Sequence, residues 1–167
     1  MLGGCLLLLA QVAQASPVDN ATQLAGLFMQ SCVQFAGDRT GLRNWARQLG
    51  LADVPEPAST AFLHDAPGMV FDASNPNGKF VVISDDAGGC SALADTANGP
   101  AVLSALEDDL RKAGIGFTPG RDVADPQEAR LQHREYTASQ GNRTWRIVTG
   151  TVRDRQGGRA MLTANPD

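Results

Sequence analysis

The sequence predicts an α+β domain, in which an N-terminal helical hairpin and one further helix pack on an antiparallel sheet of about five to six strands. Apolar residues in the first third recur at spacings of three and four, which is typical of amphipathic helices. From residue 68 onward, short apolar stretches alternate with turn sequences such as Asn75-Pro76-Asn77-Gly78. One more helical pattern interrupts these stretches, so the expected order is α-α-β-β-β-α-β-β-β.

The first two helices are expected at residues 22–36 and 41–49. Asn20 can cap the start of the first helix and Gly37 can end it. The first helix presents one apolar stripe, formed by Leu24, Leu27, Phe28, Cys32 and Phe35. The two helices are short neighbours, which favours a hairpin. Residues 52–67 are expected to be irregular, because they contain three prolines.

Six strands and the third helix follow. The helix begins at Gly99-Pro100, with proline at its favoured first position, and ends at Gly114. The sequence shows no internal repeat. The strands are expected at residues 68–71, 79–83, 90–94, 129–138, 144–152 and 159–163.

Residues 1–15 have the features of a signal peptide. An apolar run at residues 5–10 precedes Ala13-Gln14-Ala15, the small-x-small pattern that signal peptidase recognises. The mature protein is therefore expected to be a single domain of residues 16–167, periplasmic or secreted, without a transmembrane segment. No Lys or Arg precedes the apolar run, which indicates a natural start further upstream. A lipid anchor at Cys5 is the alternative, suggested by Leu2-Gly3-Gly4-Cys5.

Cleavage after Ala15 leaves two cysteines, Cys32 and Cys90, an even number in an oxidising compartment. Their spacing matches no metal signature, and Cys32 lies on the apolar stripe of the first helix. These features predict a disulfide that joins the first helix to the sheet. The alternative is a free thiol nucleophile at Cys90, for which no base is evident in the sequence.

Charge is distributed unevenly along the chain. The overall net charge is −4, but residues 1–110 carry −8 and residues 111–159 carry +5. The two parts can neutralise each other in the fold, or the basic part can bind an anionic partner. A nucleic acid is not expected, because the protein is acidic overall and carries an export signal.

A basic sheet face is the candidate binding surface. Alternate residues of a strand share a side, so Arg134 and Tyr136 fall together, and Arg146 on the next strand is expected to join them. Arg153, Arg155 and Arg159 cluster at the final turn. Arginine with tyrosine is suited to binding an anion, a polysaccharide or an acidic protein surface.

Two other groupings have possible chemistry. His64-Asp65 lies in a loop, where a histidine beside an acid can act as a base. Asp85-Asp86 lies in a glycine-containing turn that can offer oxygen ligands to a cation, but the spacing does not follow the calcium-loop pattern. A solvated loop and an ordinary turn are the favoured explanations of these two pairs. No metal site, catalytic set or cofactor is therefore predicted.

Two short stretches resemble small secreted or lipoprotein-like proteins of Gram-negative bacteria, an uncharacterised family. They are Leu27-Phe28-Met29-Gln30-Ser31-Cys32 and Gly88-Gly89-Cys90-Ser91-Ala92-Leu93. The resemblance implies a periplasmic location and supports the paired cysteines. It implies no activity.

The expected function is a periplasmic, non-enzymatic module that binds an envelope protein or an anionic glycan of the envelope. An inhibitor-like or immunity-like role belongs to this class. The alternatives are a small envelope hydrolase that uses His64 or Cys90, and a structural subunit of an envelope assembly.

Overall fold

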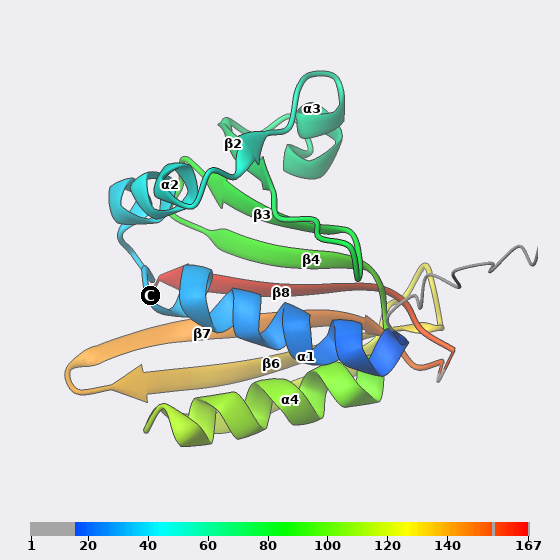
Figure 1. The fold of residues 1–167 in the computed structure, drawn as a ribbon. Coiled ribbons are helices and arrows are strands. Elements are labelled where there is room, and N and C mark those ends of the chain that lie inside the picture. Colours follow the sequence, from blue (N-terminus) through cyan, green and yellow to red (C-terminus); the bar gives the residue numbers. More distant parts are fainter. Residues whose placement is uncertain (1–15, 155, 167) are drawn as a thin grey trace, which may run out of the picture.

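The computed structural model describes residues 16–154 and 156–166. This part of the chain forms one eight-stranded antiparallel sheet with helices packed on it (Figure 1). The strands are β1 (Ala52–Asp53), β2 (Gly68–Asp72), β3 (Phe80–Asp85), β4 (Cys90–Ala97), β5 (Gly116–Ala124), β6 (Leu131–Gln140), β7 (Arg143–Val152) and β8 (Gly158–Pro166). The helices are α1 (Pro17–Phe28), the π-helical turn η1 (Met29–Val33), α2 (Arg39–Gln48), α3 (Ala58–Leu63) and α4 (Gly99–Lys112).

The strand order is β1-β2-β3-β4-β8-β7-β6-β5, so the chain builds the sheet twice from an edge to the middle. Each half is a long helix followed by four strands, α1 before β1–β4 and α4 before β5–β8. The two halves meet where β4 pairs antiparallel with β8. The fold is therefore a two-fold structural repeat, although the sequence shows none.

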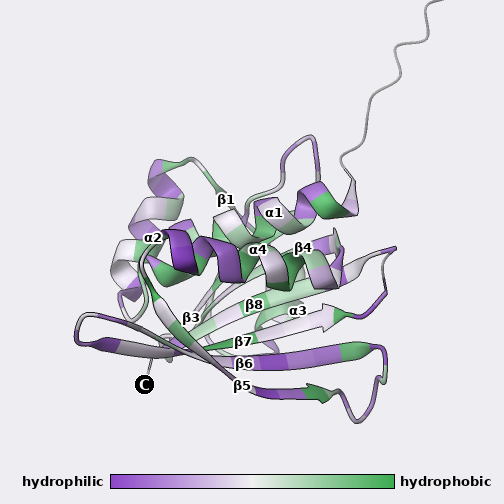
Figure 2. Ribbon diagram, turned by 90° about the horizontal axis from the view of Figure 1, so that it is seen from below, coloured by the Kyte–Doolittle hydropathy of each residue, from purple (hydrophilic) through white to green (hydrophobic). Residues whose placement is uncertain are grey.

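The helices α1 and α4 lie side by side across one face of the sheet (Figure 2). Ser16 and Asp19 form a capping box at the start of α1, and the Asn98 side chain accepts from the Ala101 backbone N–H at the start of α4. The core lies between these helices and the sheet. Its large, fully buried side chains include Leu24, Phe28, Leu106, Leu110, Ile147 and Leu162.

The predicted number of strands is wrong, because the sheet has eight strands. Strands form at all six expected positions, and the missed ones are β1 and β5, which lie at the two edges. The strand β1 has only two residues, too few for a visible alternation. The strand β5 contains Pro119 and Gly120, which sequence rules read as strand breakers. An edge strand tolerates them, because one side of its backbone has no neighbour to bond.

The predicted helical hairpin is also wrong. The first helix passes into the η1 turn, and α2 packs against η1 and β3 rather than lying along α1. Arg43 on α2 explains this placement. Its Nη2 donates to the Ser84 carbonyl oxygen at 2.9 Å and to Asp86 Oδ1 at 2.6 Å, which ties α2 to the end of β3. The segment expected to be irregular also contains a helix, α3.

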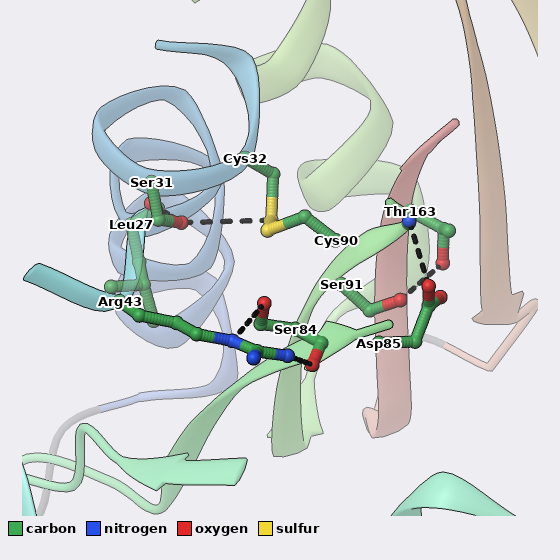
Figure 3. Close-up of a disulfide and its surroundings, with 10 residues drawn as sticks. Leu27, Ser31, Cys32, Arg43, Ser84, Asp85, Cys90, Ser91 and Thr163 are labelled. Atoms are coloured by element: carbon green, nitrogen blue, oxygen red, sulfur yellow. Dashed lines mark hydrogen bonds between the residues drawn. A yellow bond between two sulfur atoms is a disulfide. The ribbon is translucent and has the colours of Figure 1, made fainter. Parts of the chain in front are cut away.

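The predicted disulfide between Cys32 and Cys90 is present (Figure 3). Cys32 lies in η1 and Cys90 is the first residue of β4, with 5.2 Å between their Cα atoms. Both side chains are buried in the core. The bridge joins the end of the first helix to the middle of the sheet and indicates an oxidising compartment.

The predicted signal peptide and Cys5 lie outside the described residues. Among the residues that are described, no helix has the length and apolar character needed to cross a membrane.

Candidate functional site

The face of the sheet opposite α1 and α4 is called the open face here, because no long helix covers it (Figure 1). The pairing register places one residue from each of six neighbouring strands in a row across this face. Directly paired residues of antiparallel strands lie on the same side of a sheet. The row runs from β2 to β6 through Asp72, Val81, Leu93, Met161, Gly150 and His133.

Two cavities lie along this row and meet at three shared residues. One has a volume of about 590 Å³ and reaches Asp72. The other has a volume of about 380 Å³ and reaches His133. Phe62, Leu93 and Arg159 line both cavities. The two adjacent cavities are together called the open-face groove, whose lining crosses the strands rather than following one of them.

The lining of the histidine end of the groove is mainly apolar. Met161 is 38% exposed on its floor, which is a large exposure for an apolar side chain. The other large apolar side chains at this end are Phe62, Ile83, Leu93, Leu131 and Val152. An apolar ligand placed here would remove this surface from water.

The helix α3 and the β5–β6 connection form two sides of the groove. On one side α3 packs against β2 and β3, and it ends at His64 in the left-handed conformation. On the other side the β5–β6 connection contributes Glu128. Asp125 shapes this second connection, because its Oδ1 accepts from the backbone N–H groups of Gln127 and Glu128.

His133 is oriented by a carboxylate. Its Nε2 lies 2.9 Å from Asp125 Oδ2, and both side chains are partly buried. The hydrogen bond with His133 lowers the pKa of Asp125, and the two backbone N–H groups lower it further. Asp125 therefore remains a carboxylate in mild acid. Sequence reasoning missed His133, because its partner Asp125 lies in a turn eight residues earlier.

His64, the candidate base from the sequence, lines the same cavity as His133. The chain contains two histidines, and both of them line this cavity. His64 and its neighbour Asp65 are the non-glycine residues with positive φ among the described residues, at 50° and 63°. The two histidines are far apart in sequence, so no local motif could have predicted that they line the same cavity.

Arg159 is the predicted binding residue that lies in the groove. It lines both cavities, at the point where they meet. Its Nη2 lies 3.8 Å from Asp95 Oδ1, and both side chains are more than half exposed, at 69% and 57%. An exposed ion pair at this distance is weak. Arg159 can therefore exchange Asp95 for the acidic group of a ligand.

Arg134 and Tyr136 lie on the face that the helices cover. The Arg134 guanidinium bonds to Asp122 Oδ2 at 2.6 Å and lies 3.6 Å from Glu107 Oε1. Hydrogen bonds from Gln132 and then Arg134 lower the pKa of Asp122, while burial opposes them. Tyr136 is 1% exposed. Both side chains are thus engaged in holding β5 and α4 against β6.

The remaining predicted arginines are scattered. Arg146 pairs with Thr137 and Asn165 across the strands, which places it on the open face but outside the groove. Arg153 donates to the Gln132 side chain. Arg155 lies outside the described residues. The structure does not unite Arg134 and Arg146 on one basic face, because the register of β6 and β7 places them on opposite sides.

The side chains of Asp85 and Asp86 bond to other groups of the same chain. Asp86 pairs with Arg43 and Arg39, and its pKa is lowered chiefly by the hydrogen bond from Arg43. Asp85 Oδ1 accepts from the Gly89 backbone N–H. The described residues contain no group of three or more His, Cys, Asp or Glu side chains that could hold a metal ion. Cys90 is held in the disulfide and is not a thiol.

No protein-family model matches the chain, and no curated protein and no solved structure matches it either. The open-face groove, with its two histidines and Arg159, is therefore the candidate functional site of the described residues.

Proposed function

We propose that the protein is a periplasmic, non-enzymatic binding module, and that its open-face groove holds an extended segment of a partner protein. The segment is mainly apolar and carries an acidic side chain. One observation supports this proposal above the others: the groove continues across six strands, from Asp72 to His133.

The length of the groove favours an extended chain over a compact small molecule. Neighbouring strands lie about 4.8 Å apart, so six strands span about 24 Å. An extended chain rises about 3.3 Å per residue, so about seven residues fill this length. Alternate side chains of such a segment would point down toward Val81, Leu93 and Met161.

The position of Arg159 favours an acidic side chain in the middle of the segment. Arg159 lies where the two cavities meet, and its exposed ion pair with Asp95 is long. A carboxylate of the ligand, partly desolvated by the apolar lining, would pair with Arg159 more strongly than the exposed Asp95 does.

The hydrolase alternative loses one of its two residues, because Cys90 is bonded to Cys32. His64 remains, and it lies in the groove. The other groups at that end are apolar side chains, His133, Arg159 and Glu128, a set suited to holding a ligand. We therefore favour binding over hydrolysis.

A random heptapeptide library displayed on phage tests the proposal, with the protein of residues 16–167 as bait. We expect enrichment of peptides that combine apolar residues with Asp or Glu. Met161→Glu places a charge on the apolar floor and should weaken the selected peptides at least about tenfold. Gly150→Val fills the floor beside His133 and should weaken them without loss of the fold.

Matched controls exist outside the groove. Leu49→Glu, just after α2, adds the same charge at an apolar residue that is 59% exposed and lies outside the lining of both cavities. Arg146→Glu is the control for Arg159→Glu. Both control variants should still bind the selected peptides, whereas Met161→Glu and Arg159→Glu should lose this binding. If Met161→Glu binds the selected peptides as tightly as the wild type does, the proposal is overturned. It is also overturned if no peptide is enriched and the protein binds an acidic polysaccharide instead.

A further inference from the structure

We infer that the two histidines make the end of the groove an anion subsite, which takes an acidic side chain of the bound segment more tightly in mild acid. The inference rests on the proposed function and adds a regulation to it. His64 reaches this end from the C-cap position just after α3, and His133 reaches it from β6. An anion held there therefore meets imidazole groups from both halves of the fold.

The charges that face this end explain why acid is needed. Arg159 on β8 contributes one positive charge, and Asp95 on β4 offsets it. Glu128 and Asp125 in the β5–β6 connection are negative, and Asp65 follows His64. With neutral histidines the carboxylates outnumber Arg159. Histidine is the side chain type that changes charge between about pH 5 and 8, so two histidines at this end are the groups through which mild acid can favour an anion.

The orientation of His133 makes the change a switch in hydrogen bonding. Its Nε2 bonds to Asp125, so a neutral ring that donates from Nε2 offers Nδ1 only as an acceptor. Protonation turns Nδ1 into a donor, which is what a carboxylate ligand requires. The Nδ1 side is not blocked by β7, because Gly150 beside it has no side chain, and even an added Cβ would remain 3.8 Å away.

Asp125 keeps its role as the pH falls. Its pKa is lowered by the hydrogen bond with His133 and by the two backbone N–H groups, so it stays ionised in mild acid. The carboxylate thus holds the ring in one orientation in both charge states.

Two fluorescent probes of similar apolar character test the inference. Anilinonaphthalene sulfonate is an anion at every pH used, and Nile red is neutral. Between about pH 7.5 and about pH 5.5 the dissociation constant of the sulfonate should fall about five- to tenfold, as expected for two added charges near an exposed site. The constant for Nile red should change less than about twofold. Near-UV circular dichroism at both pH values checks that the fold is unchanged.

Variants separate the inference from the proposed function. His64→Gln combined with His133→Gln should abolish the acid-dependent gain for the sulfonate, while Arg146→Gln should retain it. Met161→Glu should remove both probes from the groove. If it does so, but the wild-type protein binds the sulfonate with the same affinity at both pH values, the anion subsite is wrong and the groove stands. If Met161→Glu removes neither probe, they bind elsewhere, and the groove and the subsite both fail.

Discussion

The Tyr136 hydroxyl donates a hydrogen bond to Glu107 Oε1 at 3.0 Å, which joins the middle of β6 to α4. Tyr136 is 1% exposed, and burial is the main cause that raises its pKa to about 12 from its ordinary value of 10.0. The hydrogen bond to Glu107 raises it as well, and Arg134 lowers it. The folded protein therefore resists formation of the phenolate.

The first prediction concerns this resistance. A raised pKa in the folded state gives stability that is present below the unfolded value of 10.0 and is lost as the pH rises toward about 12. Urea unfolding should show falling stability above pH 10.0 for the wild type and little such fall for Tyr136→Phe. At neutral pH this variant should lose about 1 kcal/mol, the net value of one hydrogen bond.

Tyr136 is the single tyrosine of the chain, so phenolate absorbance reports on it alone. The native protein should titrate near pH 12, and the urea-unfolded protein near 10.0. A native midpoint near 10.0 would show that Tyr136 is not buried as described.

The second prediction concerns the bond between Cys32 and Cys90. The bridge closes a loop across 58 positions of sequence, which constrains the unfolded chain. Replacement of both cysteines by alanine should lower the free energy of unfolding by about 2–4 kcal/mol. Hydrogen exchange should speed up first in η1 and the end of α1. Non-reducing mass spectrometry of residues 16–167 should find no free thiol, and ready labelling of Cys90 in native protein would contradict the bridge.

The third prediction concerns Arg43, whose side chain is 17% exposed. It donates to both the hydroxyl and the carbonyl of the buried Ser84, at 3.1 and 2.9 Å (Figure 3). Arg43→Met should lower the free energy of unfolding by about 1–3 kcal/mol, because it leaves the Ser84 groups unbonded. Arg39→Met is the matched control. Arg39 is 44% exposed and also approaches Asp86, so its loss should cost less than about 0.5 kcal/mol.

Chemical denaturation of both variants measures the difference. Similar losses for Arg43→Met and Arg39→Met would mean that the bonds to Ser84 do not hold α2 against β3. A larger loss for Arg43→Met would support the physical reason given for the absence of a helical hairpin.

Features that depend on neighbouring residues could be predicted from the sequence. The six inner strands were expected because their apolar stretches end at turn sequences, and α4 because proline and apolar spacing coincide. Cys32 and Cys90 could be paired because only two cysteines remain after residue 15. The alternation of Arg134 and Tyr136 on one side of β6 was also correct, since side-chain direction within a strand is a local property.

The tertiary structure alone decided which residues of different strands share a face. A shift of one residue in register reverses the face of a whole strand, and no local pattern records that shift. For this reason Arg146 does not join Arg134, and His133 comes to lie in one row with Gly150, Met161 and Leu93. The sequence determined the six inner strands, α4 and the bridge, whereas pairing between distant strands decided the groove, because its floor takes one residue from each of six strands.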